Sequence, residues 1–354
     1  MKIAFYISTI SHGGAERVIV NLAKEFAING HDVTLITDAE SNNEYEIDSN
    51  ISRINLGYNR KNRIIKNIYQ IHMLRRTIKE NRSEVLITFL PEPIIRALIA
   101  TICINVKNII SIRNDPKIEY KNVLHKQLAN FLYQRADRVV FQTKEAQNFF
   151  SARIQKKSTI IMNQVNKDFY EYERCGTGEY FIAVGRLTPQ KNYYMMIEAF
   201  KRFCQNNPNS ILRIYGDGPM KNELQDLIKR QNLDRNILLM GITQRVPDAL
   251  AKAKAYVLTS NYEGMPNALL EAMAMGLPCI ATDCPSGGPK AIITHKENGF
   301  LVPINDVDSL VEYLNIVENN KLLNEEISIN AKNKAEEFRP LIVYKKWEDV
   351  IINK

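Results

Sequence analysis

Two glutamates eight positions apart stand in a segment whose composition suits the binding of a phosphorylated sugar. The segment runs from Glu263 to Glu271 with the sequence EGMPNALLE, and its Gly264 and Pro266 predict a loop that becomes a helix near Asn267. Carboxylates accept hydrogen bonds from sugar hydroxyls, and the N–H groups at a helix start can hold phosphate oxygens. An isolated glutamate pair is ordinarily solvated, but the apolar run before this one and two companion motifs favour a binding site.

The first companion motif, GRLTPQKN, occupies residues 185–192 and follows another apolar run. It places Arg186 and Lys191 after a strand end, where two cations suit a pyrophosphate that gains charge as a bond to it breaks. Taken alone, the motif fits two solvated surface cations equally well.

The second companion motif, SHGGAE, occupies residues 11–16, between the first predicted strand and the first predicted helix. Gly13 and Gly14 let the backbone approach a ligand there, and the helix start favours an anion. The motif is not the G-x-G-x-x-G fingerprint, which disfavours a nicotinamide-dependent dehydrogenase. Taken alone, it fits a simple tight turn equally well.

The elements that must position these motifs alternate between short apolar strands and helices along the whole chain. This pattern is typical of parallel sheets covered on both faces, and 354 residues suit two such domains. We therefore predict an α/β fold with two doubly wound, Rossmann-like domains facing a central cleft. The predicted parts are residues 1–165, residues 166–337, and a final amphipathic helix, 338–354, that contains Trp347.

The composition excludes several classes of protein. No apolar run reaches the length of a membrane span. Residues 1–7 lack a cleavage site after them, so they are interpreted as a buried strand rather than a signal peptide. Five cysteines without a C-x-x-C pair argue against disulfides or zinc and favour a reducing cytoplasm. The five histidines show no metal-ligand spacing, and the D-x-D sequence at Asp306 is interpreted as a helix cap.

The formal net charge of +8 calls for an anionic partner, and much of it lies in residues 60–82. In that stretch Ile64, Ile68, Ile71, Leu74 and Ile78 recur at helical spacing among basic residues. Two interpretations stay open. The stretch is either an ordinary surface helix with one buried stripe, or a helix resting on anionic lipid or on a lipid-linked phosphate.

Together these motifs resemble the retaining glycosyltransferase family 4, whose fold is called GT-B. The resemblance covers nearly the whole chain and is strongest from Val184 to Val302. There the spaced glutamates, the segment GRLTPQKN and the run AMAMGLPCIATDCPSGGP match the family in order and spacing. This combination is specific for the family and says little about the sugar.

The resemblance also implies roles for individual residues. Arg186 and Lys191 would bind the pyrophosphate and stabilise the leaving nucleotide, Glu263 would contact the transferred sugar, and Glu271 would bind the ribose. The catalytic residues implied are Arg186, Lys191 and Glu263, and the donor-binding residues implied are Gly13, Gly14, Gly185, Arg186, Lys191, Ile242, Glu263, Gly264, Met265, Pro266, Asn267 and Glu271. The final helix would cross back onto the first domain. No metal or other cofactor is expected, and the anomeric configuration would be retained.

The sequence departs from the family at two places. Many relatives carry a histidine where Arg113 and Asn114 stand, so that histidine's role at the sugar is in doubt, and we expect Arg113 or Asn114 to bind sugar or acceptor. Asn163-Gln164-Val165 stands where Asn-Pro is expected, which concerns only the linker.

These observations lead to one functional expectation. The chain would be a cytoplasmic enzyme, peripheral on the inner face of the membrane, that moves a hexose or N-acetylhexosamine from a UDP-sugar to a lipid-linked saccharide in surface polysaccharide synthesis. The alternatives are a sugar-nucleotide epimerase of the same architecture and a non-catalytic module that binds a nucleotide-sugar. Nucleic-acid binding would explain the charge but not the paired glutamates, and is not expected.

Overall fold

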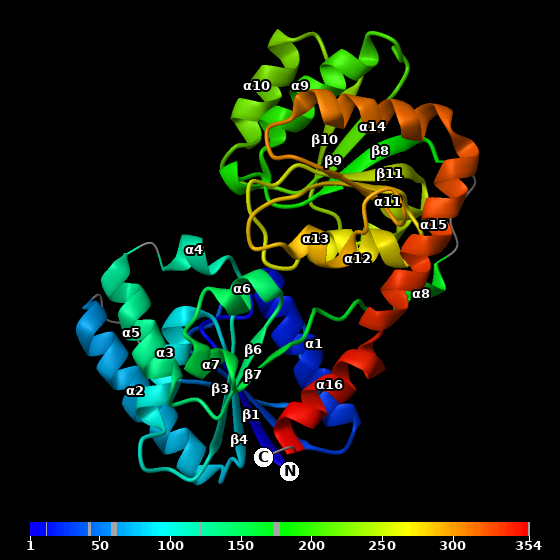
Figure 1. Ribbon diagram of the computed structural model, residues 1–354. Helices are drawn as coiled ribbons and strands as arrows, with labels where there is room; N and C mark the ends of the chain where they lie inside the picture. The colour runs from blue at the N-terminus through cyan, green and yellow to red at the C-terminus, as the bar shows by residue number, and fades with distance from the viewer. Residues whose placement is uncertain (12, 42–43, 58–61, 121, 173–177, 353–354) are drawn as a thin grey trace. The chain divides into compact units, whose positions relative to one another are not determined.

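The computed structural model describes residues 1–354 apart from 12, 42–43, 58–61, 121, 173–177 and 353–354. Several residues of the sequence analysis, His12, Arg60, Lys61 and Cys175, therefore lie outside the described residues. The chain divides into two compact units (Figure 1). Unit 1 comprises Met1–Gln164 and Pro340–Lys354, and unit 2 comprises Val165–Arg339.

Unit 1 is built on a seven-stranded sheet in the order β3-β2-β1-β4-β5-β6-β7. All its neighbouring strands are parallel, which agrees with the continuously apolar strands predicted from the sequence. The strand order reverses between β1 and β4, and such a switch point is where doubly wound sheets bind ligands. The strands are β1 (Lys2–Ile7), β2 (Asp32–Thr37), β3 (Ser52–Asn55), β4 (Val85–Phe89), β5 (Lys107–Ser111), β6 (Arg138–Phe141) and β7 (Ser158–Ile160).

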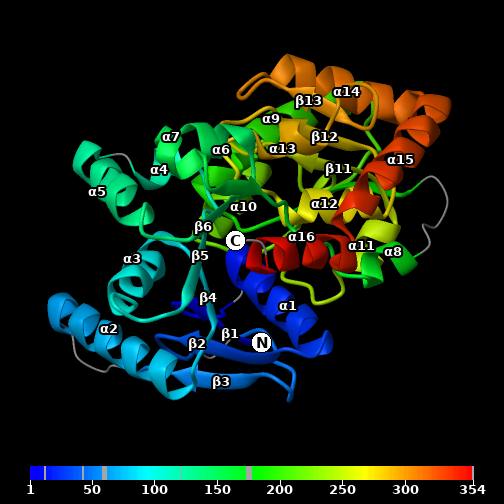
Figure 2. The ribbon, with the colours of Figure 1, turned by 60° about the horizontal axis from the view of Figure 1, so that its bottom comes forward.

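Helices cover both faces of this sheet (Figure 2). One face packs against α1 and α16, and the other packs against α2, α3 and α5. The unit 1 helices are α1 (Gly14–Ile28), α2 (Arg63–Glu80), α3 (Pro91–Ala100), α4 (Pro116–Glu119), α5 (Val123–Tyr133), α6 (Lys144–Asn148), α7 (Ala152–Gln155) and α16 (Pro340–Ile352).

The last helix, α16, belongs to unit 1 although the residues before it belong to unit 2. It packs against α1, and Trp347 is fully buried against Phe89 with a ring-centroid distance of 6.0 Å. Lys107 at the start of β5 donates to the carbonyl of Ile351 at 2.7 Å. Burial of one large aromatic ring and a hydrogen bond therefore attach the C-terminal helix to the first sheet.

Unit 2 repeats the architecture with a six-stranded parallel sheet in the order β10-β9-β8-β11-β12-β13. Its switch point lies between β8 and β11. The strands are β8 (Tyr180–Val184), β9 (Leu212–Tyr215), β10 (Ile237–Gly241), β11 (Ala253–Leu258), β12 (Cys279–Thr282) and β13 (Phe300–Val302). Its helices are α8 (Asp168–Glu171), η1 (Pro189–Lys191), α9 (Tyr193–Cys204), α10 (Lys221–Arg230), α11 (Val246–Ala251), α12 (Asn267–Ala274), α13 (Gly288–Ile292), α14 (Val307–Asn319), α15 (Lys321–Ala335) and η2 (Glu336–Phe338).

The ends of two helices have conformations that their local sequences explain. Gly30 follows α1 with a φ of 84°, the left-handed conformation that ends a helix most easily at glycine. Asp306 caps α14, since its carboxylate accepts from the N–H of Ser309 at 3.0 Å. The D-x-D sequence is thus a helix cap, as expected.

Only the second half of the apolar stripe predicted within residues 60–82 is buried. In α2, Leu74 and Ile78 are buried, but Ile64 and Ile68 are 72% and 63% exposed. The reason is position, because the second half of α2 packs on the sheet whereas its first turns line the rim of a surface pocket. Among the described residues, no helix is long and apolar enough to cross a membrane.

Candidate active site

The two strongest sequence motifs meet at the carboxyl edge of the unit 2 sheet. The segment 185–192 follows β8 and the segment 259–266 follows β11, and these two strands are neighbours at the switch point. Because parallel strands end at the same edge, both loops come together although they are about seventy residues apart. The topology therefore makes one site of two separate motifs.

Lys191 and Glu263 form an ion pair at this edge. Lys191 Nζ donates to Glu263 Oε1 at 2.5 Å, and Ser260 Oγ donates to the same oxygen at 2.7 Å. Both side chains are largely buried, which strengthens the attraction relative to a surface pair. Within the part of the chain that the structure describes, both hydrogen bonds to Glu263 end on Oε1, so Oε2 is left to accept a hydrogen bond from a hydroxyl. The Lys191 ammonium can direct its other protons toward an anion.

A network of hydrogen bonds holds the two loops against each other. Thr259 Oγ1 donates to the carbonyls of Lys191 and Asn192 at 3.0 Å each, and Asn192 Nδ2 donates to Asn261 Oδ1 at 3.1 Å. Asn192 has a φ of 48°, a left-handed conformation that asparagine tolerates better than most residues. Its side chain also caps α9. This hydrogen-bond network fixes the backbone that carries Lys191.

The loop after β11 leads into α12, which begins at Asn267 as predicted. Glu271 is buried within this helix, one turn from its start. Gly264 lies so close to Gly288 that a Cβ on Gly288 would stand 1.8 Å from the Gly264 carbonyl oxygen. The run after β12 therefore needs glycine here to let the Glu263–Asn267 loop approach it.

The other unit 2 residues expected at the donor lie around this edge. Arg186 directly follows Gly185, is exposed, and makes no ion pair among the described residues. A Cβ on Gly185 would stand 3.1 Å from Lys191 Cε, so glycine makes room for that side chain. Ile242 follows β10 and is exposed, which leaves its side chain available for a flat ring.

In unit 1, Gly13 and Gly14 begin α1 as predicted, and Gly13 is its N-cap. A Cβ on Gly13 would stand 2.1 Å from Glu16 Oε2, so the Glu16 carboxylate folds back over this glycine. A glutamate three residues after the N-cap commonly reaches back in this way. The space beside Gly13 is thus occupied by a carboxylate, which an incoming phosphate would have to displace.

A brace that the sequence motifs do not reveal supports the same glycine loop. Tyr45 donates its hydroxyl to the carbonyl of Gly13 at 3.2 Å and its N–H to the carbonyl of Ile10 at 3.0 Å. Its neighbour Glu44 accepts hydrogen bonds from Nη1 and Nη2 of Arg53, at 2.5 and 2.9 Å. The Arg53 hydrogen bonds hold the pKa of Glu44 below its usual value. Glu44, Tyr45 and Arg53 are here called the glycine-loop brace.

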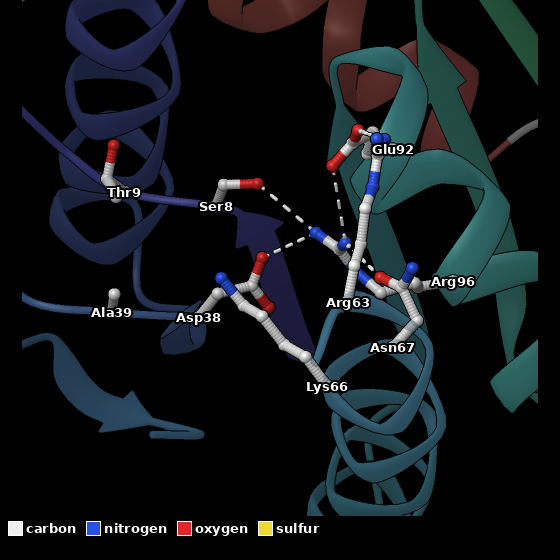
Figure 3. A pocket seen from close by; sticks show the side chains of 9 residues that line it. All are labelled: Ser8, Thr9, Asp38, Ala39, Arg63, Lys66, Asn67, Glu92 and Arg96. Atoms are coloured by element: carbon white, nitrogen blue, oxygen red, sulfur yellow. Dashed lines mark hydrogen bonds and ion pairs between the residues drawn. The ribbon is translucent and has the colours of Figure 1, made fainter. Parts of the chain in front are cut away.

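A pocket of about 250 Å³ opens at the carboxyl ends of β1 and β2 (Figure 3). Its floor is an ion pair in which Arg96 Nη2 donates to Asp38 Oδ2 at 2.5 Å. Tyr6 donates its hydroxyl to Asp38 Oδ1 at 2.6 Å and accepts from Arg96 Nε at 2.9 Å. Arg63 and Lys66, from the first turns of α2, line the pocket above this floor.

All three floor residues are buried, and their ionisation reflects it. Burial raises the pKa of Asp38, and the Arg96 charge opposes this rise. Burial and the Asp38 charge raise the pKa of Tyr6, so its hydroxyl stays a donor. The sequence motifs did not predict this cluster of Tyr6, Asp38 and Arg96. One feature of the sequence could have indicated it, because Arg96 interrupts the apolar stretch 94–106. A charge inside an apolar segment predicts a buried partner.

Arg113 lies on the other side of the same switch region, at the end of β5. It is buried, its guanidinium carbon stands 4.0 Å from the Phe89 ring centroid, and its Nη1 donates to Asn163 Oδ1 at 2.7 Å. Burial lowers its pKa to about 9. Within the described chain its Nε and Nη2 have no hydrogen-bond partner. Asn114 follows it in the chain, and a role of either residue at sugar or acceptor stays a prediction.

Comparison with known families identifies the chain. The profile described as Glycosyl transferases group 1 matches residues 165–334, and the profile described as Glycosyltransferase Family 4 matches residues 12–169. The chain belongs to this glycosyltransferase family. The family resemblance noted from the motifs is therefore confirmed.

Relatives of this glycosyltransferase are similar over its full length or over part of it. It is 26% identical to a Campylobacter jejuni enzyme named as a GalNAc-alpha-(1->4)-GalNAc-alpha-(1->3)-diNAcBac-PP-undecaprenol alpha-1,4-N-acetyl-D-galactosaminyltransferase, over 99% of this chain and 98% of that one. It is 40% identical to the UDP-Gal:alpha-D-GlcNAc-diphosphoundecaprenol alpha-1,3-galactosyltransferase of Escherichia coli, over 44% of this chain and 40% of that one.

The solved structure of HepE from Anabaena with UDP and glucose has the same fold as this glycosyltransferase. The TM-score is 0.84 at 17% identity, covering 99% of each chain. This likeness confirms the predicted GT-B fold class. Within the described residues, no group of three or more His, Cys, Asp or Glu side chains could hold a metal ion.

Proposed function

We propose that this glycosyltransferase moves a hexose or N-acetylhexosamine from a UDP-sugar to a saccharide acceptor with retention of the anomeric configuration. The observation that carries the proposal is the buried Lys191–Glu263 pair at the switch point of unit 2. It sets a cation for the diphosphate beside a carboxylate for the sugar. The UDP and glucose in HepE and the UDP-Gal in the Escherichia coli enzyme's name support the nucleotide.

Each residue at the unit 2 edge then has a definite task. Lys191 and Arg186 bind the diphosphate and stabilise the charge that develops on it, and Glu263 Oε2 accepts from a hydroxyl of the transferred sugar. Glu271 binds the ribose, and the N–H groups at the start of α12 face phosphate or sugar. Gly185, Gly264, Met265 and Pro266 shape the backbone around the ligand, and Ile242 borders the base.

The proposed reaction breaks one bond and forms one on the same face of the sugar. The bond between the anomeric carbon and the diphosphate oxygen breaks, and its electron pair leaves with UDP. The acceptor oxygen bonds to the anomeric carbon, and its proton passes to the leaving phosphate oxygen. Two cations and a helix start stabilise the leaving group, so the proposal requires no metal or other cofactor. By the family resemblance, Gly13 and Gly14 remain our candidates for a contact with the donor.

A lipid-linked acceptor is the second part of the proposal. The Campylobacter jejuni and Escherichia coli relatives are both named for undecaprenol-linked acceptors. In unit 1, Arg63 and Lys66 line the mouth of the pocket over Arg96, where an acceptor phosphate can accept from them. The basic helix α2 would hold the enzyme on the inner face of the cytoplasmic membrane. Arg113 and Asn114 remain our candidates for a sugar or acceptor contact.

Thermal unfolding with a panel of nucleotides tests the donor. UDP and one UDP-sugar are expected to raise the Tm in the presence of EDTA, because a ligand that binds only the folded state stabilises it. A Tm shift with GDP or ADP compounds instead would leave the family assignment unchanged and would replace UDP as the proposed donor nucleotide. If no compound shifts the Tm and no acceptor gives turnover, the proposal is wrong. Release of an epimerised UDP-sugar without acceptor would point to an epimerase.

The glycine-loop brace gives a prediction about donor affinity. Arg53→Leu removes both hydrogen bonds to Glu44 and loosens Tyr45 against Gly13, so the loop must be ordered when the donor binds. We expect the KM for the donor to rise about fivefold, the equivalent of about 1 kcal/mol, with little change in kcat. Steady-state kinetics measure both constants. Arg202→Leu removes an exposed arginine that also pairs with carboxylates, and it should change neither. Equal donor KM values for Arg53→Leu and wild type would contradict the role of the brace.

A further inference from the structure

The helix α5 carries apolar side chains both on the side that faces the core and on the side that faces solvent. Its inner side buries Ala129 and Tyr133 in the core of unit 1. Its outer side carries Leu124, Leu128 and Phe131, spaced by four and three residues, and Leu124 and Phe131 are both 70% exposed. A helix that is apolar on both sides is ordinarily covered on both. The outer side of α5 therefore needs an occupant.

The first turns of α2 show the same feature. Ile64, Ile65 and Ile68 are exposed there, on the first two turns of the helix. Exposed apolar residues that occur singly are common on proteins, but a contiguous group marks an interaction surface. Among the described residues, α2 and α5 together carry eight of the exposed large apolar side chains of unit 1: Ile64, Ile65, Ile68, Tyr69, Val123, Leu124, Leu128 and Phe131.

The fold brings these two helices to one side of unit 1. Both pack on the same face of the seven-stranded sheet, and α3 contacts each of them (Figure 2). Each lies in a connection that leaves the carboxyl end of a parallel strand, so their first turns lie toward the edge that carries the Asp38–Arg96 pocket. The exposed isoleucines of α2 are thus next to the pocket that we assign to the acceptor, because Arg63, Lys66 and Asn67 of the same turns line it.

The charge around these helices indicates what kind of surface covers them. In the first half of α2, residues 63–71, the charged side chains are Arg63 and Lys66, and residues 123–133 hold Lys126 and no acid. Arg63 pairs with Glu92 of α3 at 2.6 Å, so three cations stand against one carboxylate. Apolar side chains beside an excess of cations match an anionic lipid surface, where the apolar groups enter the acyl boundary and the cations meet head groups.

We propose that α5 and the first half of α2 form one docking surface for an anionic bilayer, with Leu124 and Phe131 entering the lipid. The proposal rests on the proposed function, because a lipid-linked acceptor would be delivered to the pocket from the same membrane. It adds to the basic helix a second, apolar helix that anchors the enzyme. Attraction through α2 weakens with salt, whereas the contribution of α5 does not.

Co-sedimentation with vesicles tests the proposal without donor or acceptor. Wild-type protein is compared with the double variant Leu124→Ser/Phe131→Ser on phosphatidylcholine vesicles with and without phosphatidylglycerol, at low and at physiological salt. The matched control is Leu322→Ser, because Leu322 is 80% exposed on α15 of unit 2. Both sets of substitutions lie on exposed surface and should leave the Tm within a few degrees of wild type.

We expect the double variant to bind phosphatidylglycerol vesicles roughly tenfold more weakly than wild type, and the control to bind as wild type does. Equal binding of wild type and double variant would overturn the proposal, as would failure of the wild type to bind vesicles. Analytical ultracentrifugation tests the alternative occupant. If the wild type is a dimer and the double variant is a monomer, a second copy of the chain covers this face and the proposal is overturned. Transfer to a detergent-solubilised acceptor is measured separately, so that loss of vesicle binding with turnover intact overturns only this proposal.

Discussion

Replacing Lys191 by alanine is expected to lower kcat by roughly 10²–10³-fold, the usual cost of removing one preorganised charge from a developing anion. The ammonium is held within 2.5 Å of Glu263 and its backbone is fixed by Thr259, so little motion is needed when the diphosphate gains charge. Glu263→Gln keeps the shape but removes the charge that aligns Lys191, and we expect roughly tenfold or more loss of kcat. Single-turnover rates with saturating donor measure both effects.

The same protein offers a matched control for this prediction. Lys254 pairs with Glu318 at 2.8 Å, is also partly buried and also lies in unit 2, but it stands on β11 away from the carboxyl edge. Lys254→Ala should therefore leave kcat close to that of wild type. If Lys191→Ala and Lys254→Ala reduced turnover equally, loss of stability rather than chemistry would account for both, and the site assignment would be wrong.

Replacing Arg96 by leucine is expected to lower the free energy of unfolding of unit 1 by about 3–5 kcal/mol. The change leaves Asp38 buried with its nearest cation removed, and Tyr6 loses a hydrogen-bond donor. The chain has one tryptophan, Trp347, and it is buried in the unit 1 core. Urea denaturation followed by tryptophan fluorescence therefore reports on this unit separately from unit 2.

Two further variants define what the ion pair contributes. Asp38→Asn in the Arg96→Leu background removes the unpaired charge, and it should recover part of the lost stability. Arg202→Leu breaks exposed ion pairs and should cost less than about 1 kcal/mol. A loss below about 1 kcal/mol for Arg96→Leu would show that the pair is as weak as a surface pair, which its burial argues against.

Much of this architecture could be predicted from local sequence. Short apolar strands between helices indicated two parallel sheets, and the structure has a parallel sheet in each unit. Caps were also predictable, as at Asp306, because a cap depends only on residues three positions away. The Glu263–Glu271 segment was found in the same way, since a loop that opens a helix has a local signature.

Other features follow from distant parts of the chain, and there the sequence was insufficient. The periodicity of α2 indicated one continuous buried stripe, but only the second half has a sheet beneath it. The outer leucines and phenylalanine of α5 have ordinary helical spacing, and spacing alone does not say which side meets the core. Asp38 and Arg96 form a pair across 58 positions, which no pattern of nearby residues specifies.

The sequence by itself thus determined most of the local elements, and it predicted which residues on them would serve nucleotide-sugar transfer. The tertiary structure decided which of these meet: Lys191 and Glu263 pair because β8 and β11 are neighbours at a switch point, and α16 joins unit 1 because Trp347 is buried there. The physical reason is that helix, strand and cap preferences depend on residues a few positions apart. Strand order and burial depend on the packing of the whole unit.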